Sequence, residues 1–191
     1  MGSIETVTRR PYQRATQESR REDLINAALK LIGDGGPQAA TVRAIADEAG
    51  VTAGLIRHYF NTKEELVRTA YQSLMTRLNT QSSDVASVDG GDPIKCLAHF
   101  VASSISPPVA DPAMVGKWAG FLHLVRSDID MREVHRENYF VYRDKLQDLI
   151  TAANPALTGA ALRRAAIACN GVIDGLWLEG SLISDSFEPE E

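Results

Sequence analysis

Apolar residues recur every three or four positions along most of the chain, and no stretch keeps the apolar–polar alternation of a half-buried strand. Proline placement agrees, because Pro93 and Pro112 each follow an aspartate, as a residue at N1 follows its N-cap. The other prolines fall in expected loops, at positions 11, 37, 107, 108, 155 and 189. The sequence therefore predicts an all-α protein.

Glycines and capping residues set the boundaries of the expected helices. The first helix should end at Gly35, and the fourth should begin at a capping box made by Thr62 and Glu65. The polar stretch 81–92 is the best candidate for a boundary between two units. The ranges expected to be helical are 17–34, 42–49, 53–60, a helix starting near 63, 94–104, 113–127, 129–153 and 159–184.

Composition narrows the class of protein. With 44% hydrophobic residues the chain can bury a sizeable core. It has no apolar run of about 18 residues and no basic segment followed by an apolar run at its start, so we expect a cytoplasmic protein with no membrane partner. Cys96 and Cys169 lie far apart within apolar helical patterns, which favours buried thiols over a metal site or a disulfide.

Charge is unevenly distributed along the 191 residues, whose formal net charge is −5. Residues 1–78 hold 11 Lys or Arg and 9 Asp or Glu, a net of +2, whereas the rest hold 9 and 16, a net of −7. The first part can face phosphate groups and the second cannot. Basic residues also form an expected arm ahead of the first helical core, at Arg9, Arg10, Arg14, Arg20 and Arg21.

The segment 41–60 has the pattern of two short crossed helices. Gly50 can adopt the left-handed conformation that ends the first helix, and Val51 can pack back on that helix as the apolar contact of the cap. Val51 also precedes Thr52, the N-cap of the second helix, and can pack on Ile56 one turn later. Together these signals predict a helix-turn-helix whose second helix reads DNA.

One face of that second helix suits a DNA groove. Small residues let its backbone approach the bases, and Arg57 supplies donors for guanine edges or phosphates. An ordinary solvated face is the alternative. With Ile56 and Phe60 turned inward, the residues expected to face outward are Ala53, Gly54, Arg57 and His58.

The stretch from about Arg21 to Leu78 resembles the DNA-binding domain of the TetR family, most closely from Gly50 to Leu66. The resemblance implies that Tyr59 and Lys63 hold operator phosphates and that Arg43 reaches a base or the backbone. A cation such as Lys63 at a helix start reinforces a phosphate site. The implied DNA-binding residues are Thr41, Arg43, Thr52, Ala53, Gly54, Arg57, His58, Tyr59 and Lys63.

The resemblance also implies an organisation and a role. Residues 1–62 would form the basic arm and a three-helix helix-turn-helix domain, and residues 63–191, starting with a connecting helix, an effector-binding and dimerisation domain. The implied role is a transcriptional repressor that binds a pseudo-palindromic double-stranded operator as a homodimer and is released by a small molecule. In the last helix, the small residues expected to face a partner subunit are Ala161, Ala165, Ala168, Val172 and Gly175.

The second unit resembles, more weakly, the ligand-binding part of the BetI-like branch, through residues 117–121 and 173–178. Its aromatic residues and negative net charge make a cationic amine the leading candidate effector, because aromatic faces hold quaternary ammonium groups. Packing of the same aromatic residues in a core is the alternative. The expected effector-binding residues are Trp118, Phe121, Tyr139, Asp174 and Trp177.

Two other classes of protein compete with a DNA-binding regulator. An enzyme is disfavoured, because the histidines and cysteines lack metal-binding spacings and no phosphate-binding glycine loop or Gly-x-Ser-x-Gly motif occurs. His135, between Glu133 and Glu137, is interpreted as part of a charged helix face, and His123 as a core or pocket residue. We therefore expect no catalytic residues, metal or cofactor. The second rival is a helical protein–protein adaptor that keeps the helix-turn-helix without binding DNA.

Overall fold

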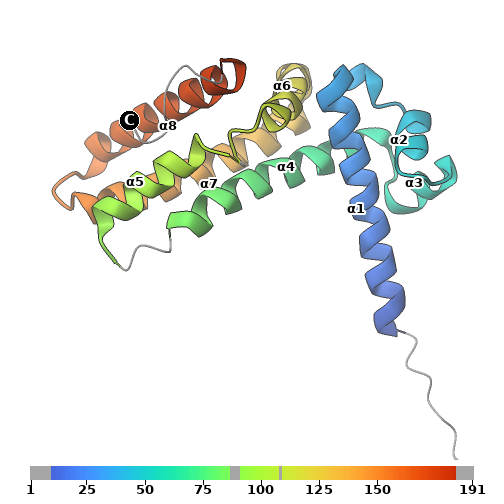
Figure 1. Cartoon of the computed structure of the whole chain (residues 1–191), viewed down its shortest axis with the longest axis horizontal. Helices are drawn as coiled ribbons and strands as arrows, with labels where there is room; N and C mark the ends of the chain where they lie inside the picture. The colour runs from blue at the N-terminus through green and yellow to red at the C-terminus, as the bar shows by residue number, and fades with distance from the viewer. Residues whose placement is uncertain (1–9, 87–90, 108, 184–191) are drawn as a thin grey trace, which may run out of the picture.

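The computed structural model describes residues 10–86, 91–107 and 109–183 (Figure 1). Over these residues the chain forms helices joined by turns and contains no strand, which confirms the expected all-α class. A short 3-10 turn spans Pro37–Ala39. The helices are α1 (Arg10–Gly35), α2 (Val42–Glu48), α3 (Ala53–Tyr59), α4 (Lys63–Ala86), α5 (Pro93–Ser104), α6 (Pro112–Ser127), α7 (Ile129–Ala153) and α8 (Gly159–Leu182).

The helix α4 joins two groups of helices (Figure 1). At its N-terminal end it packs on α1, beside which α2 and α3 lie, and further along it packs on α5 and α7. The last helix, α8, packs on α7, α6 and α5, and it forms one edge of the molecule (Figure 1). The helix-turn-helix and the larger helical bundle therefore share α4 as a common element.

The crossing of α1 and α6 forms a second connection between the two groups. Both helices have glycines there: a Cβ atom on Gly33 would come within 2.7 Å of the Lys117 side chain, and one on Gly120 within 2.8 Å of the Ile32 carbonyl oxygen. Real Cβ atoms do not approach backbone so closely, so the crossing depends on glycine at position 120.

Two expected boundaries were wrong. The helix α1 begins at Arg10, so most of the expected basic arm is helical and Pro11 lies in its first turn, where proline costs no intrahelical hydrogen bond. The helix α4 continues to Ala86, through the first half of the expected boundary 81–92, because that half contains no glycine or proline. Arg9 and Pro189 lie outside the described residues. The other helix ends match the expected ranges within two residues.

No helix within the described residues is both long and apolar enough to cross a membrane.

Candidate nucleic-acid interface and internal cavity

The turn between α2 and α3 has the geometry that its glycine predicted. Gly50 has φ 64°, its N–H donates to the Asp47 carbonyl at 3.2 Å, and the N–H of Val51 donates to the Ala46 carbonyl at 2.9 Å. These two bonds form a Schellman cap, which satisfies the last carbonyls of α2. At the other end of α2, the Thr41 hydroxyl accepts a hydrogen bond from the Ala44 N–H at 3.1 Å. Both ends of α2 are thus fixed by local contacts.

The helix α3 presents the expected face to solvent. Ile56 and Phe60 are buried, and Val51 packs against the same core. Thr52 occupies the N-cap position in an extended conformation, although its side chain makes no capping hydrogen bond. The residues left exposed on and just before α3 are Thr52, Ala53, Gly54, Arg57 and His58. The predicted orientation of α3 is therefore confirmed.

The start of α4 is capped somewhat differently from the prediction. The Thr62 hydroxyl accepts a hydrogen bond from the Glu65 N–H at 3.0 Å, as a capping box requires. The Glu65 carboxylate, however, accepts from the backbone N–H and the side-chain amide of Asn61, both at 3.0 Å, and not from the Thr62 N–H. This pair of bonds fixes the turn that carries Lys63.

The cationic side chains of this surface are held only loosely within the protein. Arg43 reaches Asp47 at 3.8 Å with its side chain 93% exposed, and Lys63 reaches Glu64 at 3.8 Å. Exposed ion pairs at this distance contribute little free energy. Both cations can therefore exchange their carboxylate partners for phosphates. Tyr59 is half-buried, and its ring meets that of His58 edge-on at 5.2 Å.

Two further features of this surface come from the tertiary structure. The guanidinium of Arg21, on α1, lies over the Phe60 ring at 5.1 Å, which joins the basic side of α1 to the end of α3. Gly54 has open space around it, since the nearest atom to a Cβ placed there would be the Thr52 hydroxyl oxygen at 4.0 Å. Packing inside the protein therefore does not explain why this position is a glycine.

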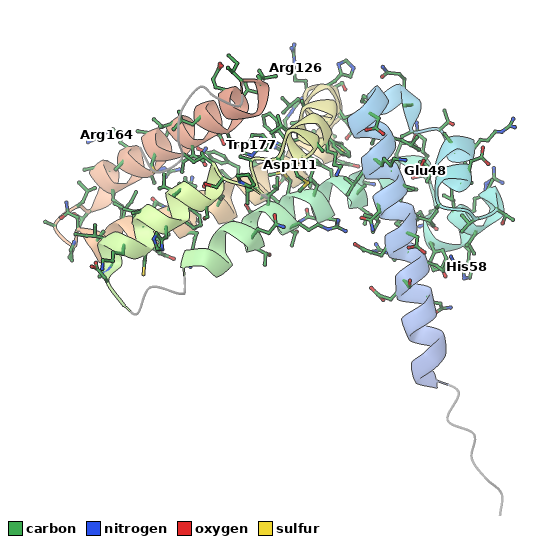
Figure 2. All side chains as sticks on the ribbon, in the orientation of Figure 1. Glu48, His58, Asp111, Arg126, Arg164 and Trp177 are labelled. Atoms are coloured by element: carbon green, nitrogen blue, oxygen red, sulfur yellow. The ribbon has the colours of Figure 1, made fainter. Side chains whose placement is uncertain are left out.

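A cavity of about 150 Å³ lies within the second group of helices. Its walls come from α4, α5, α6, α7 and α8, together with Val109 in the loop between α5 and α6. Figure 2 shows Trp177 inside this group, beside α8. The lining residues are Met75, Leu78, Asn79, Ser104, Val109, Trp118, His135, Asn138, Tyr139, Tyr142, Asn170, Ile173, Asp174 and Trp177.

An aromatic corner forms one wall of the cavity. The rings of Trp118 and Trp177 meet edge-to-face with centroids 5.1 Å apart. The indole N–H of Trp177 donates to the Val109 carbonyl oxygen at 2.9 Å, which ties α8 to the loop between α5 and α6. Tyr139 lies on the same cavity.

The cavity has one carboxylate. Asp174 lies at the rim of the cavity and is exposed. Desolvation by its partly apolar surroundings nevertheless raises the pKa of its carboxyl, and the hydrogen bond from Asn170 offsets part of this increase. The Asn170 amide donates to the carboxylate at 2.8 Å. A cation bound beside Asp174 would supply the opposite charge that this carboxylate lacks.

Polar side chains that the sequence did not indicate line the rest of the cavity. The Tyr142 hydroxyl donates to the Ser104 hydroxyl at 2.7 Å, and Ser104 in turn donates to the Phe100 carbonyl at 2.8 Å. Burial raises the pKa of Tyr142. Asn138 donates to Gln72 at 3.1 Å and to the Val134 carbonyl at 2.8 Å. These polar groups are satisfied by one another, so they favour a defined cavity shape.

The structure separates Phe121 from the other expected effector residues. Phe121 is fully buried and stacks on Tyr71, with centroids 4.8 Å apart, and it does not line the cavity. Tyr71 also lies 2.7 Å from the His135 imidazole, measured from its hydroxyl to Nδ1. The interpretation of His135 as part of a charged helix face was therefore wrong, since it is half-buried, lines the cavity, and has its pKa lowered by burial. His123, expected in a core or pocket, is exposed.

Comparisons with known proteins agree with this architecture. Residues 24–70 match the family model described as bacterial regulatory proteins of the tetR family, and residues 93–191 match the model of the BetI-type transcriptional repressor C-terminal region. An HTH-type transcriptional regulator BetI from Pectobacterium carotovorum is 31% identical over 92% of this chain and 89% of that protein.

Solved structures give the same result. A putative transcriptional regulator from Pseudomonas aeruginosa PAO1 superposes with a TM-score of 0.84 and 31% identity, covering 94% of this chain and 88% of that one. A putative regulator from Saccharomonospora viridis, solved in complex with choline, shares the fold with a TM-score of 0.74 at 16% identity, over 91% of each chain. The chain therefore belongs to the TetR family of DNA-binding transcriptional regulators, with a C-terminal part of the BetI type.

Proposed function

We propose that this regulator is a repressor that binds a pseudo-palindromic operator as a homodimer and leaves it when a small organic cation occupies the cavity. The observation that carries the DNA half of this proposal is the outward face of α3, where Ala53, Gly54, Arg57 and His58 are exposed on a helix that follows the capped turn at the end of α2. A protein of this kind acts in the cytoplasm, where the DNA lies, and needs no catalytic residue, metal or cofactor.

The proposed DNA contacts divide into two kinds. Arg57 and His58 on α3 would reach base edges, and the small residues before them would let the helix enter the major groove. Phosphates would be held by Lys63, Tyr59, Thr41 and Thr52, and Arg43 would reach either a base or the backbone. One α3 reads only a few base pairs, so two copies related by a two-fold axis are needed for a selective site.

The effector is proposed to be a cationic amine. Trp118, Trp177 and Tyr139 offer aromatic faces, and Asp174 offers a carboxylate at the same cavity. Aromatic faces and a partly desolvated carboxylate both favour a bound cation over a neutral or anionic ligand. The choline bound to the Saccharomonospora viridis regulator is consistent with this chemistry.

The proposed division of labour places the DNA-binding domain in residues 1–62 and the effector and dimerisation domain in 63–191. An effector that bound the DNA-binding conformation and the released conformation equally well would not shift the equilibrium between them. The effector must therefore favour one spacing of the two α3 helices in the dimer. The elements available to carry such a change are α4, which lines the cavity with Met75 and Leu78, and α6, which carries Trp118 and crosses α1.

Fluorescence anisotropy with DNA from upstream of the protein's own gene tests the proposal. We expect steeply salt-dependent binding that choline or betaine aldehyde reverses. Absence of binding to any upstream fragment, together with capture of a protein partner, would favour the adaptor alternative. Release by a neutral or anionic compound, with no effect of any cation, would support the repressor function and contradict the proposal that the effector is a cation.

A further inference from the structure

His135, on α7, lies between the cavity and a buried tyrosine. It lines the cavity, and its ring stacks on the ring of Tyr71 from α4, with centroids 6.2 Å apart and an angle of 13° between the ring planes. Its Nδ1 atom lies 2.7 Å from the Tyr71 hydroxyl oxygen. The stacking and the hydrogen bond together fix both the position and the rotation of the imidazole.

The direction of this hydrogen bond determines where the imidazole carries its own proton. Tyr71 is fully buried and burial raises the pKa of its hydroxyl, so the hydroxyl keeps its proton and needs an acceptor for it. Within the described part of the chain, that acceptor is Nδ1 of His135. Burial also lowers the pKa of His135, which keeps the imidazole neutral at neutral pH. A neutral imidazole that accepts at Nδ1 carries its proton on Nε2.

The Nε2–H group of His135 has no acceptor among the described residues. Over the same ranges, the side-chain nitrogen or oxygen atom that is both fully buried and without a partner is Oε1 of Gln81, so Nε2 of His135 keeps accessible surface. Because His135 lines the cavity, this donor is available to a ligand bound there.

Other ring donors at the cavity are either used within the protein or less firmly held. The Tyr142 hydroxyl and the Trp177 indole N–H both donate to groups of the protein. The Trp118 indole and the Tyr139 hydroxyl have no hydrogen-bond partner among the described residues, so no hydrogen bond orients either of them. His135 is therefore the donor that the fold orients before a ligand arrives.

His135 and Asp174 lie toward different ends of the cavity wall that α7 forms. His135 and Tyr142 both line the cavity and are seven positions apart, roughly 10 Å along the helix. Burial is the main cause that raises the pKa of Tyr142, and the negative charge of Asp174 adds to it, so Asp174 lies near the Tyr142 end. A cationic group beside Asp174 therefore leaves the His135 donor free for a second group of the same ligand.

We infer that the effector is a small organic cation that also carries an oxygen atom, and that this oxygen accepts a hydrogen bond from Nε2–H of His135 while the cationic group lies beside Asp174. The inference rests on the proposed cationic effector and adds to it the second functional group and the residue that selects it. Tyr71 is a positioning residue, because it does not line the cavity but sets the tautomer of His135. A ligand without the oxygen leaves an oriented donor unpaired, which lowers its affinity.

Calorimetry with two cations of nearly equal shape tests the inference. Choline and propyltrimethylammonium differ in one group, which is a hydroxyl in the first and a methyl in the second. We expect the unaltered protein to bind choline about 3- to 30-fold more tightly. His135→Phe should remove this preference by weakening choline binding alone, and His135→Gln, which keeps a donor, should retain part of it. The matched control is His123→Phe, an exposed histidine of α6 outside the cavity, which should keep the full preference.

Nitrogen NMR of isotopically labelled histidine tests the role of Tyr71 without any ligand. Above neutral pH the unaltered protein should show His135 with its proton on Nε2, and the signal is assigned by its absence from His135→Gln. Tyr71→Phe removes the hydroxyl that fixes the tautomer, so it should give a mixture of the two tautomers. The same variant should lose part of the choline preference while it binds propyltrimethylammonium as before.

The possible outcomes separate this inference from the proposed function. Equal affinity for the two cations, or a His135 that carries its proton on Nδ1, would overturn the inference and leave the cationic effector supported. A choline preference that survives both His135 variants would assign the oxygen to Trp118 or Tyr139 and would overturn the inference as well. Binding of neither cation would overturn the cationic effector together with the inference.

Discussion

Gly120 of α6 lies so close to Ile32 of α1 that a Cβ atom at position 120 would come within 2.8 Å of the Ile32 carbonyl oxygen. This contact joins the helix that carries Trp118 to the helix on which the helix-turn-helix packs. The two functional regions are thus in contact through backbone atoms, which cannot move aside as a flexible side chain can.

The first prediction concerns this crossing. Gly120→Ala should lower the free energy of unfolding by about 1–3 kcal/mol, because the new methyl group forces α1 and α6 apart. Gly116→Ala on the same helix is the control, since its Cβ atom would meet the Gly33 carbonyl oxygen at an ordinary 3.7 Å. This variant should raise the free energy of unfolding by up to about 1 kcal/mol, because alanine favours a helix over glycine. Urea unfolding measures both, and equal stabilities would contradict the close crossing.

The second prediction concerns the charges of the DNA surface. Lys63→Ala should weaken binding to all sequences and lower the slope of log affinity against log salt by about one. Arg57→Ala should weaken the free energy of operator binding by about 1–3 kcal/mol and should also reduce the preference for the operator sequence over other DNA. Lys95→Ala, which removes an equal charge from an exposed position on α5, is the control. Anisotropy across a salt series checks all three, and unchanged affinity in both interface variants would defeat the assignment.

A third prediction separates stability from DNA binding at a single position. Gly54→Ala has room for its methyl group and should raise the stability of α3, by up to about 1 kcal/mol, because alanine favours a helix over glycine. The same methyl group would stand between α3 and the groove, so operator affinity should fall. A variant that is more stable and binds DNA as well as before would show that Gly54 does not face the bases.

The fourth prediction concerns the hydrogen bond from Trp177. Trp177→Phe keeps an aromatic ring against Trp118 but leaves the Val109 carbonyl without its donor, which should cost about 1–3 kcal/mol of unfolding free energy. Trp118→Phe is the matched control, since no acceptor for its indole N–H is found among the described residues. Thermal and urea unfolding of the two variants should differ, with Trp177→Phe the less stable.

The fifth prediction concerns the pH dependence of effector binding. Only the ionised Asp174 attracts a cation, and desolvation raises the pKa of this carboxyl, so choline affinity should fall as pH decreases toward that raised pKa. His135 acts in the same direction, because its protonation at low pH places a second cation in the cavity. Asp174→Asn should weaken binding and leave only the part of the pH dependence that belongs to His135.

Calorimetry with choline from about pH 7 down to the lowest pH at which the protein stays folded measures this effect, because the carboxyl and the imidazole both take up their protons below neutral pH. Trp118→Ala should weaken the same binding about 3- to 30-fold without changing its pH dependence, because it removes an aromatic face and no titrating group. An affinity that stays constant throughout this acidic range in the unaltered protein would show that Asp174 does not contact the cation.

The sequence by itself determined the helix-turn-helix. The left-handed Gly50 and the Thr41 and Thr62 caps depend on contacts between residues a few positions apart, and helical periodicity gives the inward positions of Ile56 and Phe60. Residue types at fixed separations in the sequence predict interactions of this kind, so they can be recognised before any tertiary structure is known. The all-α class followed from the same local periodicity.

Only the tertiary structure decided the composition of the cavity. Its walls join residues as distant as Met75 and Trp177, and helical spacing cannot tell a buried aromatic residue that lines a cavity from one that fills a core. Trp118 and Phe121 show this, since both lie on α6, yet one lines the cavity and the other stacks on Tyr71. His135 was misjudged for the same reason: its neighbours in sequence are charged, but packing of α7 on α4 turns it inward.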